Sequence, residues 1–264
     1  MDLQLEGKRA LVTGSSSGIG AAIARALSTE GALVVVHGRN EARARQIAAE
    51  LPRPGFVAIG DLATPIGAGK VVDQILGSTG GLDILVNNAG AFRSMPWMAS
   101  TPDAWLSTYN ENVVSMVRMI HAFAPGMKAA KWGRIIQIAS RAAVRPRTQM
   151  PDYSAGKAAV LNLTVSLAKD LAPFSITVNA VSPGIIITPA VETQFRQMAL
   201  ERGWGTDWED IERNIVREWQ YDPCVRLGRP DDVAHTVAFL SSPLAAGISG
   251  INLRVDGGGT GTLA

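Results

Sequence analysis

Cysteine is almost missing from this chain of 264 residues, and the one present is Cys224. A single cysteine cannot form a disulfide within the chain, and no cluster of cysteine and histidine has metal-ligand spacing. No apolar run reaches the roughly 18 residues that a membrane-spanning helix needs. The first residues, Met1 to Lys8, also lack the basic and apolar regions of a signal peptide. We therefore predict no disulfide, no metal, no membrane segment and a cytoplasmic location.

The net charge is also small, because 25 basic and 23 acidic residues leave the chain at only +2. With so small a charge and no recognition module, a nucleic acid partner is disfavoured. One stretch differs from the rest: between Asn112 and Pro151 there is no Asp or Glu, and the basic residues there are Arg118, Lys128, Lys131, Arg134, Arg141, Arg145 and Arg147. Near a ligand cleft, such a segment attracts an anionic substrate or an acidic carrier protein. A basic helix end in solvent explains the pattern equally well.

Apolar runs recur along the chain with helical patterns between most of them. The runs are residues 10–13, 32–37, 56–59, 82–86, 135–139, 176–181 and 250–255. Continuous apolar character is typical of strands buried on both faces of a parallel sheet. We therefore predict one α/β domain over residues 1–264: a doubly wound, Rossmann-type, seven-stranded and mainly parallel sheet with helices on both faces. Ligands of such sheets bind beyond the carboxyl ends of the strands.

A glycine-rich turn follows the first predicted strand. The segment runs from Gly14 through Ser15, Ser16 and Ser17 to Gly18, Ile19 and Gly20, and an alanine-rich helical pattern follows. Glycines in such a turn let backbone N–H groups at the helix N-terminus approach a phosphate without obstruction by a Cβ. The spacing departs from the G-x-G-x-x-G dinucleotide pattern. The turn predicts an anion site, with an ordinary glycine-rich turn as the alternative.

Tyr153 and Lys157 are four residues apart in a predicted helix that starts near Asp152, and Ser140 ends the fifth apolar run. Residues at i and i+4 share a helix face, so the Lys157 ammonium can lie near the Tyr153 phenol. A nearby cation and a helix N-terminus both favour the phenolate, so we expect the pKa of Tyr153 to be lowered. Ser140 can hold a carbonyl or alcohol oxygen beside that phenol. A solvated helix face would also produce the Tyr to Lys spacing.

Together these segments resemble the short-chain dehydrogenase/reductase family, and its 3-oxoacyl-[acyl-carrier-protein] reductase-like members in particular. The resemblance covers nearly the whole chain, with Asn87 to Gly90 as a further matching motif. It implies a catalytic set of Ser140, Tyr153, Lys157 and Asn112, with Asn110 as an alternative to Asn112. It implies a cofactor site made of Gly14, Ser15, Ser16, Ser17, Gly18, Ile19, Gly20, Arg39, Asp61, Leu62, Asn88, Ala89, Gly90, Tyr153, Lys157, Pro183, Gly184 and Thr188. Glycine at 156, where the family more often has serine, leaves the Tyr to Lys register intact.

The end of the second strand bears on the choice of nicotinamide cofactor. An NAD-type site places a carboxylate there for the ribose hydroxyls. This chain has Gly38 at that position, followed by Arg39, whose planar guanidinium suits a phosphate. We therefore predict NADP(H), with NAD(H) as the alternative and with Arg39 in a merely solvated helix start as the other explanation. Residues 87–90 either line the cofactor site or brace the turn after the fourth strand.

The resemblance implies an NADP(H)-dependent oxidoreductase that interconverts a carbonyl and a secondary alcohol, with Tyr153 exchanging the proton. A 3-oxoacyl substrate is the first expectation; a sugar, polyol or cyclic alcohol, or a regulator without catalysis, is the alternative. Residues 185–222 are expected to form an inserted substrate-binding segment. Its aromatic residues either line an apolar pocket or lid or belong to helices that pack on the domain's own flank: Phe195, Trp204, Trp208, Trp219 and Tyr221. The substrate is a small molecule, anionic or carrier-linked in some readings. Apolar positions on residues 103–130 and 152–171 predict a homotetramer.

Overall fold

The computed structural model describes residues 1–219 and 226–261. Its seven strands form one sheet in the order β3-β2-β1-β4-β5-β6-β7, and every neighbouring pair is parallel. The strands are β1 (Arg9–Val12), β2 (Leu33–Gly38), β3 (Phe56–Ile59), β4 (Ile84–Asn87), β5 (Gly133–Ile138), β6 (Ile176–Pro183) and β7 (Asn252–Val255). The predicted doubly wound sheet is confirmed, and every predicted apolar run contributes a strand.

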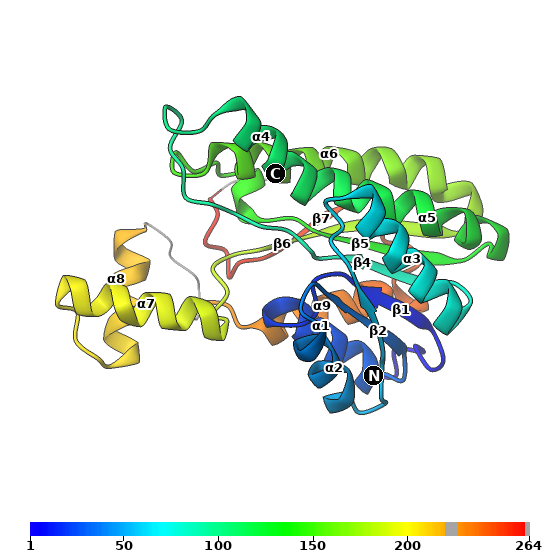
Figure 1. The fold of residues 1–264 in the computed structure, drawn as a ribbon. Coiled ribbons are helices and arrows are strands. Elements are labelled where there is room, and N and C mark those ends of the chain that lie inside the picture. Colours follow the sequence, from blue (N-terminus) through cyan, green and yellow to red (C-terminus); the bar gives the residue numbers. More distant parts are fainter. Residues whose placement is uncertain (220–225, 262–264) are drawn as a thin grey trace.

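Helices cover both faces of this sheet (Figure 1). They are α1 (Gly18–Thr29), α2 (Glu41–Glu50), α3 (Pro65–Thr79), α4 (Pro102–Tyr109), α5 (Ser115–Ala130), α6 (Pro151–Leu171), α7 (Pro189–Arg202), α8 (Trp208–Glu218) and α9 (Pro230–Ser241). Helices α1, α2 and α9 lie on one face, and α3, α5 and α6 lie on the other. Among the described residues, no helix is both long and apolar enough to cross a membrane.

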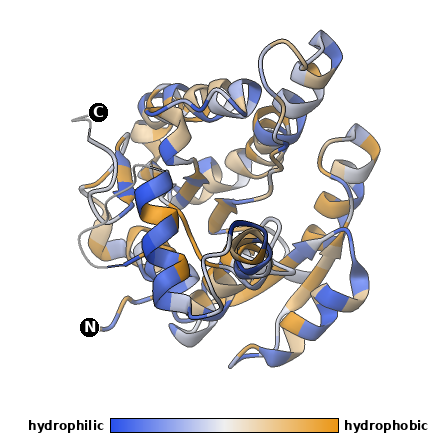
Figure 2. Cartoon of the chain, turned by 90° about the vertical axis from the view of Figure 1, so that its left-hand side faces the viewer, coloured by the Kyte–Doolittle hydropathy of each residue, from blue (hydrophilic) through white to orange (hydrophobic). Residues whose placement is uncertain are grey.

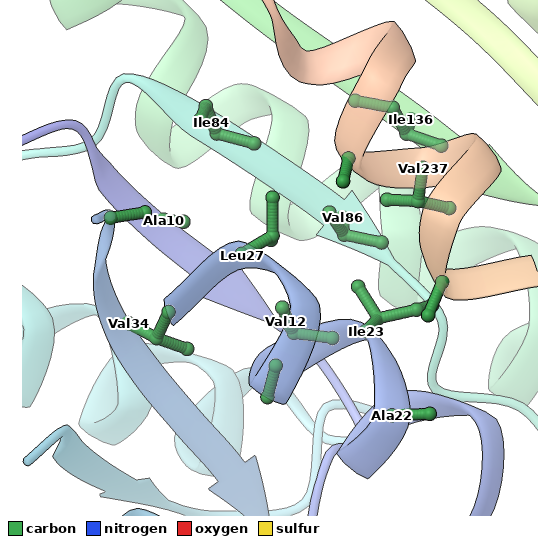
Figure 3. Packing of buried hydrophobic residues seen from close by; sticks show 14 of the residues in the cluster. Ala10, Val12, Ala22, Ile23, Leu27, Val34, Ile84, Val86, Ile136 and Val237 are labelled. Atoms are coloured by element: carbon green, nitrogen blue, oxygen red, sulfur yellow. The ribbon is translucent and has the colours of Figure 1, made fainter. Parts of the chain in front are cut away.

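Two apolar layers hold the helices to the sheet, one on each face. In the first, Ile23 and Leu27 of α1 and Val237 of α9 pack against strand residues such as Val12 and Val86 (Figure 3). All five side chains are fully buried. Alternate residues of β1 to β6, such as Leu11 and Leu85, point into the second layer. Burying both faces explains why the strands read as continuous apolar runs.

The helix expected over residues 103–130 is divided by a π-helical turn, Asn110–Val114, between α4 and α5. The Asn112 amide donates to the carbonyl of Thr108 at 2.9 Å, and the Ser115 hydroxyl donates to that of Glu111 at 2.7 Å. Such side-chain bonds offer the backbone an alternative to the regular ladder, and π-helical turns are frequent at functional sites. The turn places Asn112 in the protein interior.

Helices α7 and α8 form a lobe that projects from the carboxyl edge of the sheet, at the left of Figure 1. Phe195, Ile211 and Ile215 are buried in a cluster of the lobe's own, against which Trp204, Trp208 and Trp219 pack. In Figure 2, which faces this edge, hydrophobic colour is concentrated on the central strands and polar colour on the outer helices. The described aromatic residues therefore pack within the lobe itself, and Trp208 also lines a cavity. Tyr221 and Asp222, like Cys224, lie outside the described residues.

Candidate active site

The predicted trio comes together at the carboxyl edge of the sheet. Ser140 follows β5 and caps a short 3₁₀ turn, accepting from the N–H of Ala142 at 3.1 Å. Tyr153 and Lys157 stand on the first turns of α6, which begins at Pro151. Ser140 is hydrogen-bonded to the Tyr153 phenol. Lys157 Nζ lies 5.6 Å from the centroid of the phenol ring, so the helical spacing does bring cation and phenol together.

The Lys157 ammonium is buried and donates to the carbonyl of Ile138, the last residue of β5, at 2.8 Å. Burial disfavours the charged form and lowers the pKa of Lys157 from 10.5 to about 8. The expected lowering of the Tyr153 pKa is wrong for the protein without ligands. Burial of the phenol raises the Tyr153 pKa, and the hydrogen bond from Ser140 opposes that rise only in part. The desolvation cost of the phenolate outweighs that hydrogen bond.

Asn112 is fully buried beside this trio. Its amide donates to the carbonyls of Ala91 and Thr108 at 2.8 and 2.9 Å, while its Oδ1 has no partner among the described residues. A Cβ added at Gly90 would lie 2.6 Å from that Oδ1 and 3.6 Å from Lys157 Nζ. The amide oxygen and the ammonium therefore flank the same small space.

Asn110, the alternative to Asn112, serves another purpose. Its amide donates to the carbonyl of Ala63 at 2.7 Å, and its Oδ1 accepts from Arg118 at 3.0 Å. The first contact ties the π-helical turn to the loop that follows β3, and the second ties it to α5. Asn112 is therefore the asparagine that faces the trio.

Two contacts around Tyr153 were not foreseen from the sequence. The Thr108 hydroxyl donates to the buried carboxylate of Asp152 at 2.6 Å, which joins α4 to the first turn of α6. Phe92, in the loop after β4, meets the Tyr153 ring edge-on with 5.9 Å between centroids, and 57% of Phe92 is exposed. The exposed Phe92 ring therefore covers one side of the phenol. Neither pairing has a local sequence signal.

The glycine turn lies at the N-terminus of α1. Gly14 and Gly18 have φ values of +67° and +56°, a conformation that side chains other than glycine rarely adopt. Ser17 precedes α1 without a side-chain cap, so its first N–H groups keep their capacity to bind an anion. Ser15 differs from the other predicted cofactor residues. It is fully buried, its hydroxyl donates to the carbonyl of Val12 at 2.6 Å, and its N–H donates to that of His37 at 2.8 Å.

His37 was not assigned a role from the sequence, yet it connects three parts of the cofactor side. Its Nδ1 accepts from the N–H of Gly14 at 2.9 Å, and its Nε2 lies 3.1 Å from the carbonyl of Gly60 after β3. These partners require the neutral tautomer with the proton on Nε2. Burial lowers the pKa of His37 to about 4, which keeps the ring neutral. The ring thereby fixes the turn against the ends of β2 and β3.

A cavity of about 260 Å³ opens between the glycine turn and the ends of β2, β3 and β4. Its lining includes the predicted residues Gly14, Ser16, Ser17, Arg39, Asp61, Leu62, Asn88, Ala89 and Gly90. Arg39 is exposed there, and a Cβ at Gly38 would lie only 2.7 Å from the Ser16 hydroxyl. The glycine thus keeps this end of the cavity open without a carboxylate.

Residues 87–90 also brace the turn after β4, which is the second of the two roles predicted for them. Asn88 Nδ2 donates to the carbonyl of Thr13 at 2.8 Å, and the Thr13 hydroxyl accepts from the N–H groups of Asn88 and Ala89, each at 2.9 Å. Asn88, Ala89 and Gly90 line the cavity as well, so the segment both braces the turn and borders the cavity. The two readings are compatible.

The predicted cofactor residues Pro183, Gly184 and Thr188 lie at and after the end of β6. Pro183 is the last residue of that strand, and Gly184 donates its N–H to the carbonyl of Val255 at 2.9 Å. Thr188 caps α7, accepting from the N–H of Val191 at 3.3 Å, and its methyl group lies 3.4 Å from a Cβ built at Gly18. The segment therefore reaches the N-terminus of α1. The predicted residues at the ends of β1 to β6 converge on one edge.

A larger cavity of about 740 Å³ lies on the outer side of α1, toward α2, α8 and the start of α9. It touches Ser16 to Gly18 but none of Ser140, Tyr153 or Lys157. Its lining carries both signs of charge, and Arg25 and Glu50 within it are paired at 2.9 Å. We therefore place the chemistry at the trio. No group of three or more potential metal ligands occurs in the described part of the chain.

This arrangement defines a short-chain dehydrogenase/reductase, and comparison with known proteins agrees. The sequence profile of the short chain dehydrogenase family matches residues 8–199. The chain belongs to this family and is an oxidoreductase acting on alcohol or carbonyl substrates.

Particular relatives cover nearly the whole chain. The 3-oxoacyl-[acyl-carrier-protein] reductase FabG of Vibrio cholerae is 36% identical over 97% of this chain and 98% of its own. L-sorbose reductase from Gluconobacter frateurii, solved with NADPH and L-sorbose, is 35% identical, with complete coverage of both chains and a TM-score of 0.92. A 7α-hydroxysteroid dehydrogenase, solved with NADH and 7-oxo glycochenodeoxycholic acid, is 32% identical, with a TM-score of 0.85 over 100% of this chain and 98% of that one.

Proposed function

We propose that this protein is an NADP(H)-dependent reductase of a small carbonyl compound, in which Tyr153 exchanges the proton with the substrate oxygen. The observation that carries the proposal is the convergence of Ser140, Tyr153 and Lys157, with Ser140 hydrogen-bonded to the phenol and Lys157 anchored on the Ile138 carbonyl. A hydroxyl beside a proton donor can hold and polarise a carbonyl oxygen.

The residues present fit a nicotinamide dinucleotide. The positive-φ glycines and uncapped N-terminus of α1 suit its pyrophosphate, and the cavity lined by Arg39, Asp61 and Gly90 suits its adenosine end. When bound, the reduced nicotinamide supplies the hydride. Ser15 is assigned to the turn's framework, because both of its donors are used inside the protein.

Proton transfer is then the task of this chain's own groups. Tyr153 gives its proton to the carbonyl oxygen that Ser140 polarises, and in the reverse direction it takes the proton from the alcohol. Lys157 favours the phenolate that remains, and this matters because burial alone raises the pKa of Tyr153. We assign Asn112 to the support of Lys157, since its unpartnered Oδ1 and the ammonium flank the same space at Gly90.

NADP(H) is proposed over NAD(H) because Gly38 offers no carboxylate and Arg39 stands exposed on the cavity. The similar proteins do not decide the substrate: a carrier-linked 3-oxoacyl group, a keto sugar and a steroid are all represented among them. A 3-oxoacyl compound and a cyclic or sugar ketone therefore both belong to the proposal. Residues 185–222 are proposed as the substrate-binding segment of a single cofactor-binding domain.

Steady-state rates with NADPH and NADH across 3-oxoacyl thioesters, cyclic ketones and keto sugars test the proposal. We expect one ketone class to be turned over with NADPH preferred, and Tyr153→Phe to lower kcat by about 100-fold to 10,000-fold. Cofactor binding without turnover of any of these ketones would instead favour a nucleotide-binding regulator. We also propose a cytoplasmic homotetramer; a monomeric mass in light scattering at micromolar concentration would refute the tetramer.

A further inference from the structure

Arg147 occupies an unusual position at the junction of three elements. Its backbone N–H donates to the hydroxyl of Ser154, the residue after Tyr153, at 3.2 Å. Arg147 therefore lies against the first turn of α6. Its guanidinium stacks on the indole of Trp219, at the end of α8, with 4.4 Å between the guanidinium carbon and the ring centroid. Arg147 therefore stands where the substrate-side loop after β5 meets the α7–α8 lobe.

The guanidinium of Arg147 is half-buried. Among the described residues Arg147 forms no ion pair. Burial of the guanidinium and the positive charge of Arg145 both lower the pKa of Arg147. Arg196 in the lobe is different, because it also stacks on a tryptophan but pairs with Glu192 at 2.7 Å. A partly desolvated cation without a counter-ion is costly in a structure that needs it only for packing.

We propose that Arg147 recognises an anionic group, a carboxylate in the first instance, on the carbonyl substrate that Tyr153 protonates. Stacking on Trp219 uses one face of the guanidinium and fixes its plane, which leaves the N–H edges for a planar, bidentate bond to a carboxylate. The absence of Asp and Glu from residues 113–150 keeps the surrounding loop free of competing anions. This inference rests on the proposed function and narrows its substrate to anionic ketones.

A 3-oxo carboxylate and its methyl ester, which differ in charge, provide the test. We expect wild type to favour the carboxylate in kcat/KM, and Arg147→Gln to lower kcat/KM for the carboxylate by about tenfold to a hundredfold while leaving the ester nearly unchanged. Arg147→Lys should recover part of the loss. Arg196→Gln is the matched control, because it removes a stacked but ion-paired arginine and should leave the carboxylate-to-ester ratio unaltered.

An equal loss for both substrates in Arg147→Gln would overturn the inference, since it would show that Arg147 only holds the lobe. A stronger effect on a 3-oxoacyl thioester of an acidic carrier protein than on the free acid would overturn it as well. Calorimetry of a 3-hydroxy carboxylate on the cofactor-bound protein separates this inference from the proposed function. Without turnover of any ketone, binding that Arg147→Gln abolishes still supports the anion site, and equal binding by both proteins refutes it.

Discussion

Replacing the buried Lys157 by methionine should make the protein more stable and inactive at once. Burial lowers the pKa of Lys157 from 10.5 to about 8, so keeping the ammonium charged at pH 7 costs about 3 kcal/mol of folding free energy at about 1.4 kcal/mol for each pKa unit. Methionine of similar length removes that cost. It also leaves the Ile138 carbonyl without its 2.8 Å donor, a loss of about 1 kcal/mol.

The net expectation for Lys157→Met is a gain of about 2 kcal/mol at pH 7, or roughly 4–8 °C in Tm for a chain of this size. The stability gain of Lys157→Met becomes smaller as pH rises. Between pH 8 and 10.5 the unfolded wild type binds more protons at Lys157 than the folded protein does, so wild-type stability recovers as pH rises. The difference in unfolding free energy between the two proteins should therefore be largest below pH 8 and approach zero toward pH 10.5.

Thermal unfolding of the cofactor-free proteins at pH 7 and at pH 9.5 checks this, with turnover measured in parallel. Lys169→Met is the matched control, because Lys169 is exposed on the same helix and its replacement should change neither Tm nor its pH dependence appreciably. A variant less stable than wild type at pH 7, or a gap that stays constant with pH, would refute the reasoning.

Three further predictions concern the cofactor side. His37 is neutral when folded, with a pKa of about 4 against 6.5 unfolded, so about 3 kcal/mol of stability should be present above pH 6.5 and lost as pH falls toward 4, and His37→Asn should abolish this loss in Tm-versus-pH curves. Gly38→Asp should weaken NADPH binding by about tenfold to a hundredfold and gain NADH binding only when Ser16→Gly removes the 2.7 Å clash, as titration of cofactor fluorescence would reveal. Gly90→Ala, whose Cβ would lie 2.6 Å from Asn112 Oδ1, should lower kcat by up to about 100-fold in steady-state assays; an unchanged kcat would contradict the assigned role of Asn112.

Much of the sheet could be predicted from the sequence, because a strand buried on both faces has a direct apolar signature. The i and i+4 spacing likewise placed Lys157 near Tyr153, since a helix fixes that geometry locally. Desolvation has no such local signature: the sign of the Tyr153 pKa shift depends on how the surrounding elements bury the phenol. His37 was missed for the same reason, because its partners Gly14 and Gly60 are each 23 residues away. The π-helical turn was missed because its side-chain bonds interrupt an otherwise regular helical pattern.

The parallel pairing of every strand has a consequence for how the protein acquires its activity. Each parallel pair needs a long crossover, and the hydrogen bond that the Asn88 N–H donates to the Thr13 hydroxyl joins residues 75 positions apart. Such long-range closures are slow to form, so we expect folding on a timescale well above that of a helical bundle of equal length. Recovery of cofactor binding during refolding should therefore follow the appearance of secondary structure and report the completion of the sheet.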